Sequence, residues 1–150
     1  MAKVARVLIA DNDETERSLM ERAFEDVFPR AMPEFVRDGR EVIEHLQSAE
    51  SWTGLILLDV SMQGTGAFAV LEWLRRHPGL AGIPVFVTSD VSSALDETRA
   101  LELGAKGCLA KPHDFEGMRK LVANMERYCF PKTATFSGGR FKQIHGGYRF

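Results

Sequence analysis

Cysteine is scarce in this sequence, and long hydrophobic runs are absent from it. The two cysteines, Cys108 and Cys129, are too few for a disulfide framework or for a zinc site built from four thiolates. Uncharged apolar runs such as residues 55–58 are far shorter than the roughly 20 residues that a membrane-spanning helix needs. Acidic residues follow residue 10 before the hydrophobic core of a signal peptide can develop. We therefore expect a cytoplasmic protein without membrane contact.

Acidic residues are also absent from the last 21 positions, which distinguishes this segment from the rest of the chain. Residues 1–129 carry 15 Lys and Arg against 21 Asp and Glu, a formal charge of −6, whereas residues 130–150 carry a charge of +4. The segment holds four Phe, one Tyr and two Gly-Gly pairs, a mixture that can indicate nucleic-acid binding. Four dispersed cations on an acidic protein instead favour a docking or dimerisation extension. We expect one domain over residues 1–129 and an extension over residues 130–150.

The rest of the sequence alternates short apolar runs with amphipathic segments. Runs rich in Val, Ile and Leu predict strands at residues 4–10, 34–36, 55–58, 84–88 and 107–110. Apolar residues at i, i+3 and i+4 spacing predict helices around residues 19–28, 42–46, 68–74, 95–103 and 114–127. Asp13 is placed to cap the first helix, and Gly104 to follow the end of the fourth. The alternation predicts an α/β three-layer sandwich around a parallel sheet.

Polar residues follow four of the five predicted strands. Asp11 and Asn12 follow the first strand, Asp59 ends the third, Thr88 ends the fourth and Lys111 follows the fifth. Because ligands of such sheets bind at the carboxyl ends of the strands, these side chains are expected to meet at one edge. The set suits transfer of a phosphoryl group to the Asp59 carboxylate. Mg²⁺ prefers oxygen ligands, which Asp11 and Asp59 offer.

Four motifs make the sequence resemble a known family. VLIADNDETER, LILLDVSMQGTGAF, PVFVTSD and GAKGCLAKP, in this order, resemble the receiver domain of two-component response regulators over about residues 4–127. The resemblance implies a flavodoxin-like (βα)5 fold with strand order 2-1-3-4-5. It also implies that a sensor histidine kinase or a phosphotransfer protein donates a phosphoryl group to the chain. Apart from self-catalysed phosphoryl transfer and dephosphorylation, no enzymatic activity is expected.

The resemblance also assigns roles to individual residues. Asp59 corresponds to the phosphoacceptor, Thr88 to the switch hydroxyl and Lys111 to the lysine that pairs with the phosphoryl group. The peptide bond between Lys111 and Pro112 is expected to be cis, as is usual in the family. The implied metal ligands are side chains of Asp11, Asn12 and Asp59 and the backbone carbonyl of Ser61. Ser61 and Asp90 occupy the two positions that tune dephosphorylation.

Three departures from the family pattern motivate a second interpretation. Asn12 stands where receivers usually carry a second acid, which predicts weak Mg²⁺ binding. Cys108 stands where an aromatic switch residue is usual, and Gln63 replaces a common proline. An alternative is therefore a pseudo-receiver, a binding or dimerisation module that works without phosphorylation. A flavin-binding or hydrolytic enzyme is disfavoured, because the first strand is not followed by a glycine-rich phosphate loop.

The residues after position 127 bear on the output of the protein. Only 23 residues follow, too few for a DNA-binding or enzymatic output domain. We therefore expect a stand-alone receiver that signals through an unidentified downstream protein. A homodimer through the last two helices and the last strand, or through the extension, is a further expectation.

Overall fold

The computed structural model describes residues 5–48, 53–62, 64–90 and 94–129, and the backbone of residues 143–144 and 147–148. Strands and helices alternate along the main part of the chain, and their bounds are as follows: β1 Ala5–Ala10, α1 Glu14–Val27, β2 Ala31–Val36, α2 Gly39–Gln47, β3 Leu55–Asp59, α3 Ala67–Arg75, the 3-10 helix η1 Pro78–Leu80, β4 Val85–Ser89, α4 Ala94–Glu102, β5 Gly107–Ala110 and α5 Phe115–Cys129. Within these described residues, no helix is both long enough and apolar enough to cross a membrane.

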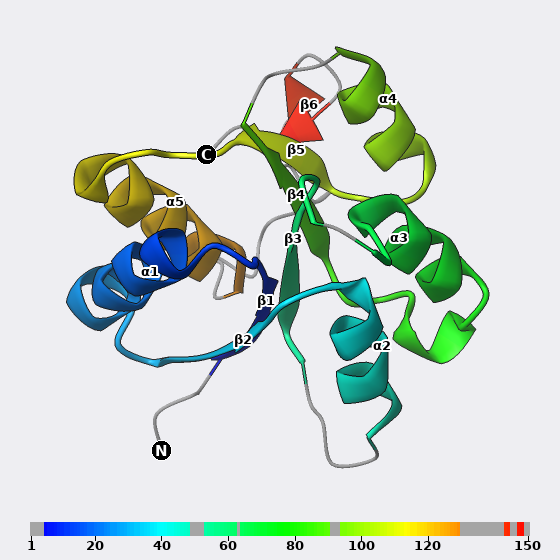
Figure 1. The fold of residues 1–150 in the computed structure, drawn as a ribbon, viewed down its shortest axis with the longest axis horizontal. Helices are drawn as coiled ribbons and strands as arrows, with labels where there is room; N and C mark the ends of the chain where they lie inside the picture. The colour runs from blue at the N-terminus through cyan, green and yellow to red at the C-terminus, as the bar shows by residue number, and fades with distance from the viewer. Residues whose placement is uncertain are drawn as a thin grey trace, which may run out of the picture.

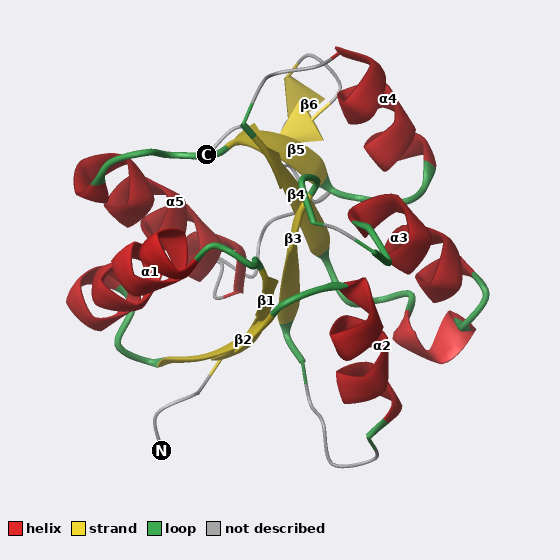
Figure 2. Ribbon diagram, in the orientation of Figure 1, coloured by secondary structure: helices red, strands yellow, loops and turns green. Residues whose placement is uncertain are grey.

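The five strands form one parallel sheet between two layers of helices. Its order is β2-β1-β3-β4-β5, as the resemblance to receiver domains implied. Helices α1 and α5 cover one face of the sheet, and α2, α3 and α4 cover the other (Figures 1 and 2). Every residue of β3 and β4 is buried, which accounts for their continuous apolar sequence. The fold is therefore the expected three-layer sandwich.

Each face of the sheet has its own hydrophobic core. The core under α1 and α5 contains the aromatic side chains of Phe24, Phe28 and Phe86. The core on the opposite face is aliphatic, with Ile56, Leu58 and side chains of α2 and α3. Alternate residues of one strand point to opposite faces, so a single strand such as β3 supplies both cores. The central strands are thereby held on both sides, and their carboxyl ends are fixed in position.

Two segments differ from the expectation. Strand β2 begins at Ala31 rather than near residue 34 and includes Pro33. A proline is tolerated there because β2 is an edge strand, with only β1 as a neighbour. Of the expected extension, the structure describes β6 Gln143–Ile144 and β7 Gly147–Tyr148, an antiparallel pair, and β7 lies close to β5. The rest of residues 130–150 lies outside the described residues.

Asp13 and Gly104 have the capping roles that the sequence predicted. The Asp13 side chain accepts a hydrogen bond from the backbone N–H of Glu16 at 3.0 Å and so caps α1. Gly104 follows α4 with a φ of 104°, a conformation that glycine adopts without steric cost. These caps set where α1 starts and where α4 ends.

Gly39, at the start of α2, lies against the loop between β3 and α3. Its N–H donates to the carbonyl oxygen of Thr65 at 2.9 Å. A Cβ atom at this position would lie 2.6 Å from that same oxygen and 2.6 Å from Cγ2 of Val70. A side chain at position 39 would therefore push α2 away from the loop that follows β3.

We expect Gly39→Ala to lower the free energy of unfolding by about 1–3 kcal/mol, the usual cost of overpacking a buried contact. Chemical denaturation of the two proteins measures the difference. Gly79→Ala is the matched control, because a Cβ there meets no atom within 4 Å. Equal stability of Gly39→Ala and wild type would contradict the close approach.

Candidate functional site

Buried polar side chains concentrate at the carboxyl edge of the sheet. Among the described residues, all the buried polar or charged side chains belong to this edge: Asp11, Asp59, Thr88, Ser89 and Lys111. Asp11 directly follows β1, and Lys111 directly follows β5. Asp59 and Thr88 are register partners on the neighbouring strands β3 and β4. Four separated segments thus bring the predicted residues together.

The ammonium group of Lys111 is the centre of this cluster. Its Nζ atom donates to Oδ2 of Asp59 at 2.5 Å. It lies 3.6 Å from Oδ2 of Asp11, and the side chains of Lys111 and Asp11 are each 4% exposed. Because the ion pairs are buried, water screens them little. Lys111 therefore ties the ends of β1, β3 and β5 to one another.

The second oxygen of Asp59 is held from its own loop. Oδ1 accepts hydrogen bonds from the backbone N–H and from the hydroxyl of Ser61, both at 2.9 Å. With Lys111 on Oδ2, both oxygens of this carboxylate are hydrogen bonded. The Asp59 side chain is thereby fixed in one orientation at the end of β3.

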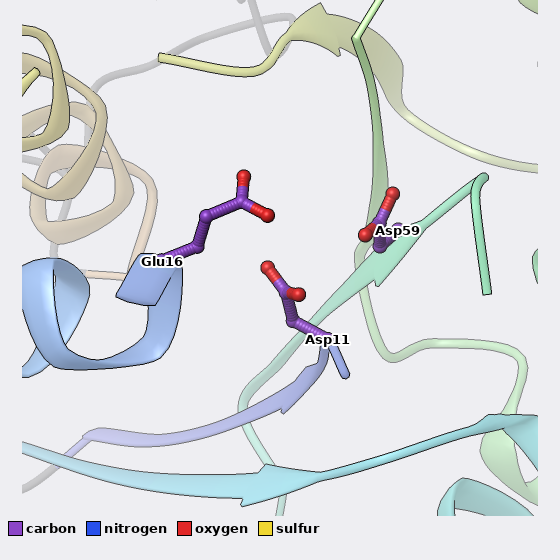
Figure 3. Close-up of side chains that lie close together, drawn as sticks. All are labelled: Asp11, Glu16 and Asp59. Carbon is purple, nitrogen blue, oxygen red and sulfur yellow. The ribbon is translucent and has the colours of Figure 1, made fainter. Parts of the chain in front are cut away.

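Glu16 is a member of the cluster that the sequence reasoning did not identify. It comes from the first turn of α1, and its Oε1 accepts a hydrogen bond from Nζ of Lys111 at 3.0 Å. The side chains of Asp11, Glu16 and Asp59 extend toward one another (Figure 3). One oxygen from each lies within 4.8 Å of the other two. The only sequence signal was the Asp-x-x-Glu spacing from Asp13, which is typical of a helix cap.

Burial and an excess of carboxylates together determine the electrostatics of the cluster. Burial raises the pKa of the Asp11 carboxyl above its ordinary value, and the charge of Asp59 adds to this rise. Burial likewise raises the pKa of Glu16, with a contribution from Asp11. Burial of Lys111 opposes its charge, but hydrogen bonds to Asp59 and Glu16 outweigh it and raise the pKa of Lys111. Lys111 stays protonated, but its single positive charge does not balance the three carboxylates, so the cluster has a net negative charge.

The donor set fits a divalent cation that prefers oxygen. Three carboxylates and one ammonium carry a formal charge of −2, which a bound Mg²⁺ would neutralise. Oε2 of Glu16 is buried and has no hydrogen-bond partner among the described residues. A buried carboxylate oxygen without a partner is costly unless a ligand satisfies it. Asp11, Glu16 and Asp59 thus form an acidic cluster that is compatible with a divalent cation.

The remaining predicted positions differ in their surroundings. Asn12 and Asp90 are exposed, and Ser61 is exposed beside Asp59. Cys108 is half-buried and packs against the aliphatic core. Burial raises the pKa of its thiol, with contributions from Glu97 and Asp96. Gln63 lies outside the described residues.

One expectation about the backbone was wrong. The peptide bond between Lys111 and Pro112 is trans, as are all peptide bonds of the described chain. The trans form of a bond before proline is favoured by about 0.5–1 kcal/mol unless its surroundings select the cis form. Lys111 reaches Asp59 with this bond in the trans form.

Comparison with known proteins agrees with this geometry. The sequence model described as the response regulator receiver domain matches residues 7–123. The probable methanogenesis regulatory protein FilR2 of Methanothrix harundinacea is 28% identical over 126 residues, which cover 81% of this chain and 81% of FilR2. Two other curated relatives are longer. The matched part of the chain covers 52% of the transcriptional regulatory protein GltR of Pseudomonas aeruginosa and 14% of the gliding motility regulatory protein of Myxococcus xanthus.

Solved structures show the same fold at lower identity. The phosphorylated cyanobacterial phytochrome response regulator RcpA is similar with a TM-score of 0.77 and 21% identity, over 87% of this chain and 96% of RcpA. The Mn²⁺-bound form of response regulator Rcp1 is similar with a TM-score of 0.74 and 22% identity, over 86% of this chain and 96% of Rcp1. At these identities the likeness concerns the arrangement of the strands and helices.

The raised pKa of Asp11 makes a prediction about stability. The folded chain binds a proton at Asp11 more tightly than the unfolded chain does. As the pH rises above 3.8, the ordinary pKa of this carboxyl, Asp11 therefore destabilises the fold increasingly. In metal-free buffer at pH 7, we expect Asp11→Asn to raise the melting temperature by about 2–4 °C, or about 1 kcal/mol. The gain should shrink as the pH falls toward 3.8.

Thermal unfolding followed by circular dichroism in the presence of a chelator measures this shift. Glu21→Gln is the control, because it removes an exposed carboxylate from α1, the helix that carries Glu16. A lower melting temperature for Asp11→Asn at pH 7 would show that the charge of Asp11 stabilises the metal-free fold.

Proposed function

This chain belongs to the response regulator receiver domain family, and from that membership we propose that it is a single-domain response regulator with Asp59 as its phosphoacceptor. The observation that carries the proposal is the buried contact of 2.5 Å between Lys111 and Asp59, beside Thr88 at the same edge of the sheet. A binding scaffold has no need to bury a lysine among three carboxylates. The donor would be a histidine kinase or a phosphotransfer protein.

The proposed reaction moves a phosphoryl group from a phosphohistidine to Asp59. A carboxylate oxygen forms the new bond to phosphorus, and the bond between phosphorus and nitrogen breaks with its electron pair going to the imidazole. Ser61 holds the carboxylate in place through its N–H and hydroxyl. Lys111 and the hydroxyl of Thr88 would bind the phosphoryl oxygens. When bound, Mg²⁺ would supply further positive charge to these oxygens.

The metal would be held by carboxylates of the same cluster. Asp11 and Asp59 are the ligands with the strongest support, because both are buried and both approach the same space. Asn12 and the backbone carbonyl of Ser61 complete the set that the family pattern implies. The solved Mn²⁺-bound form of Rcp1 shows that a protein of the same fold can bind a divalent cation.

The proposed output is a change in protein contacts. Cys108 has no aromatic ring to move, so the response to phosphorylation would pass through Thr88 and the backbone of β4 and β5. The face formed by α4, β5 and α5 would then change its affinity for a downstream protein or for a second copy of the chain. The strand β7 of the extension lies close to β5 and thus belongs to this region.

The second candidate function is the pseudo-receiver. The exposed amide of Asn12 and the aliphatic surroundings of Cys108 are the observations that favour it. The two functions make opposite predictions for covalent modification of Asp59, so one experiment separates them.

We expect acetyl phosphate to add one phosphoryl group to the wild-type chain in a Mg²⁺-dependent reaction, and Asp59→Asn to abolish the adduct. Intact-mass spectrometry detects the product. Asp26→Asn is the matched control, because it removes an exposed carboxylate of α1. An unmodified wild type, under conditions in which another receiver is labelled, would favour the pseudo-receiver.

Asp90 directly follows β4 and is exposed. In the proposed function, its carboxylate would orient a water molecule toward the phosphoryl group. We expect Asp90→Ala to lengthen the lifetime of the phosphorylated protein about tenfold, since a positioned base contributes at least this much. Decay of the adduct after removal of acetyl phosphate gives the rate. Glu72→Ala on α3 should decay as wild type, and an unchanged rate for Asp90→Ala would remove Asp90 from this role.

A further inference from the structure

We propose that Glu16 is a ligand of the divalent cation and replaces the acid that is missing at Asn12. The proposal rests on the proposed receiver function, because it concerns the cation of that same site. Its basis is the position of the Glu16 carboxylate in the acidic cluster, although Glu16 follows no strand of the sheet (Figure 3). It also revises the expectation that Asn12 makes Mg²⁺ binding weak.

The first turn of α1 explains why Glu16 points into the site. Asp13 caps the helix, and Glu16 is three residues further on, where a glutamate usually bends back to the N–H of the capping residue. Here that N–H already donates to Oδ1 of Asp11 at 2.8 Å. The carboxylate of Glu16 is therefore available to the cluster and accepts a hydrogen bond from Lys111 instead.

Glu16 also sets the net charge of the site. Asn12 is exposed and neutral, so Asp11 and Asp59 alone would bring two negative charges against the one positive charge of Lys111. With Glu16 the site has three carboxylates and one lysine, the balance expected of a receiver with acids at both positions 11 and 12. In this chain the third carboxylate thus comes from α1 instead of the loop after β1, and the total charge of the site is the same.

The two oxygens of Glu16 have different environments. Oε1 is bound to Nζ of Lys111 at 3.0 Å. Oε2 is buried and without a hydrogen-bond partner among the described residues. Oε1 thus orients the side chain, whereas Oε2 is an unsatisfied acceptor. One oxygen of Glu16 lies within 4.8 Å of an oxygen of Asp11 and of an oxygen of Asp59, which is close enough for one cation to bind all three carboxylates.

Binding of Mn²⁺ alone, in the absence of a phosphoryl donor, tests the proposal. The amplitude of the free Mn²⁺ signal in electron paramagnetic resonance gives the dissociation constant for the full chain. Glu16→Gln removes the charge, Glu16→Asp keeps the charge but shortens its reach, and Glu14→Gln removes an exposed carboxylate from the same helical turn. Circular dichroism establishes that each variant is folded.

We expect Glu16→Gln and Glu16→Asp each to weaken Mn²⁺ binding by about tenfold or more, since affinity depends on the number and placement of charged ligands. Glu14→Gln should stay within about twofold of wild type, as expected for an exposed charge. Unchanged binding by Glu16→Gln would overturn the proposal. So would wild-type affinity in Glu16→Asp, because Glu16 would then act only through its charge. A wild type that binds no Mn²⁺ would instead refute the metal-dependent function itself.

Discussion

The buried ammonium of Lys111 is the interaction on which the site depends. In the described part of the chain, Lys111 is the one buried basic side chain, and it contacts carboxylates from β3, from the loop after β1 and from α1. Its removal would leave three carboxylates close together without a counter-charge. The parallel sheet makes the arrangement possible, because it brings the carboxyl ends of β1, β3, β4 and β5 to one edge.

The same cluster opposes folding and favours ligand binding. Burial and mutual repulsion raise the pKa of Asp11 and of Glu16, which shows that their charged forms are held at a cost. The two hydrophobic cores, which fix β3 and β4 on both faces, hold the carboxylates together despite this repulsion. A cation that restores the charge balance therefore stabilises the fold as it binds. The carboxylates that we propose as metal ligands are therefore expected to lower the stability of the metal-free fold.

The fold and most of the site were predictable from the sequence. Periodicity and turn residues are local signals, and they indicated the strands, the caps at Asp13 and Gly104, and the edge where Asp59, Thr88 and Lys111 meet. Glu16 was not predictable, because its role depends on Asp11 occupying the N–H of Asp13, a contact between side chain and backbone that no spacing reveals. The length of β2 likewise depends on the tertiary surroundings, because Pro33 is tolerated only where the strand lies at the edge of the sheet. The trans bond before Pro112 is the default form of such a bond, and the expectation of a cis bond came from the resemblance alone.

The central claim is that the cluster binds a phosphoryl group on Asp59 together with a divalent cation. Beryllofluoride, which forms a stable analogue of a phosphorylated aspartate, tests it without a kinase. Titration of the labelled full chain, followed by two-dimensional amide NMR, reports on each strand end separately. The account predicts saturable shifts at Asp59, Thr88 and Lys111 that require Mg²⁺ and disappear with a chelator. Unchanged spectra at these residues in the presence of Mg²⁺ would contradict it.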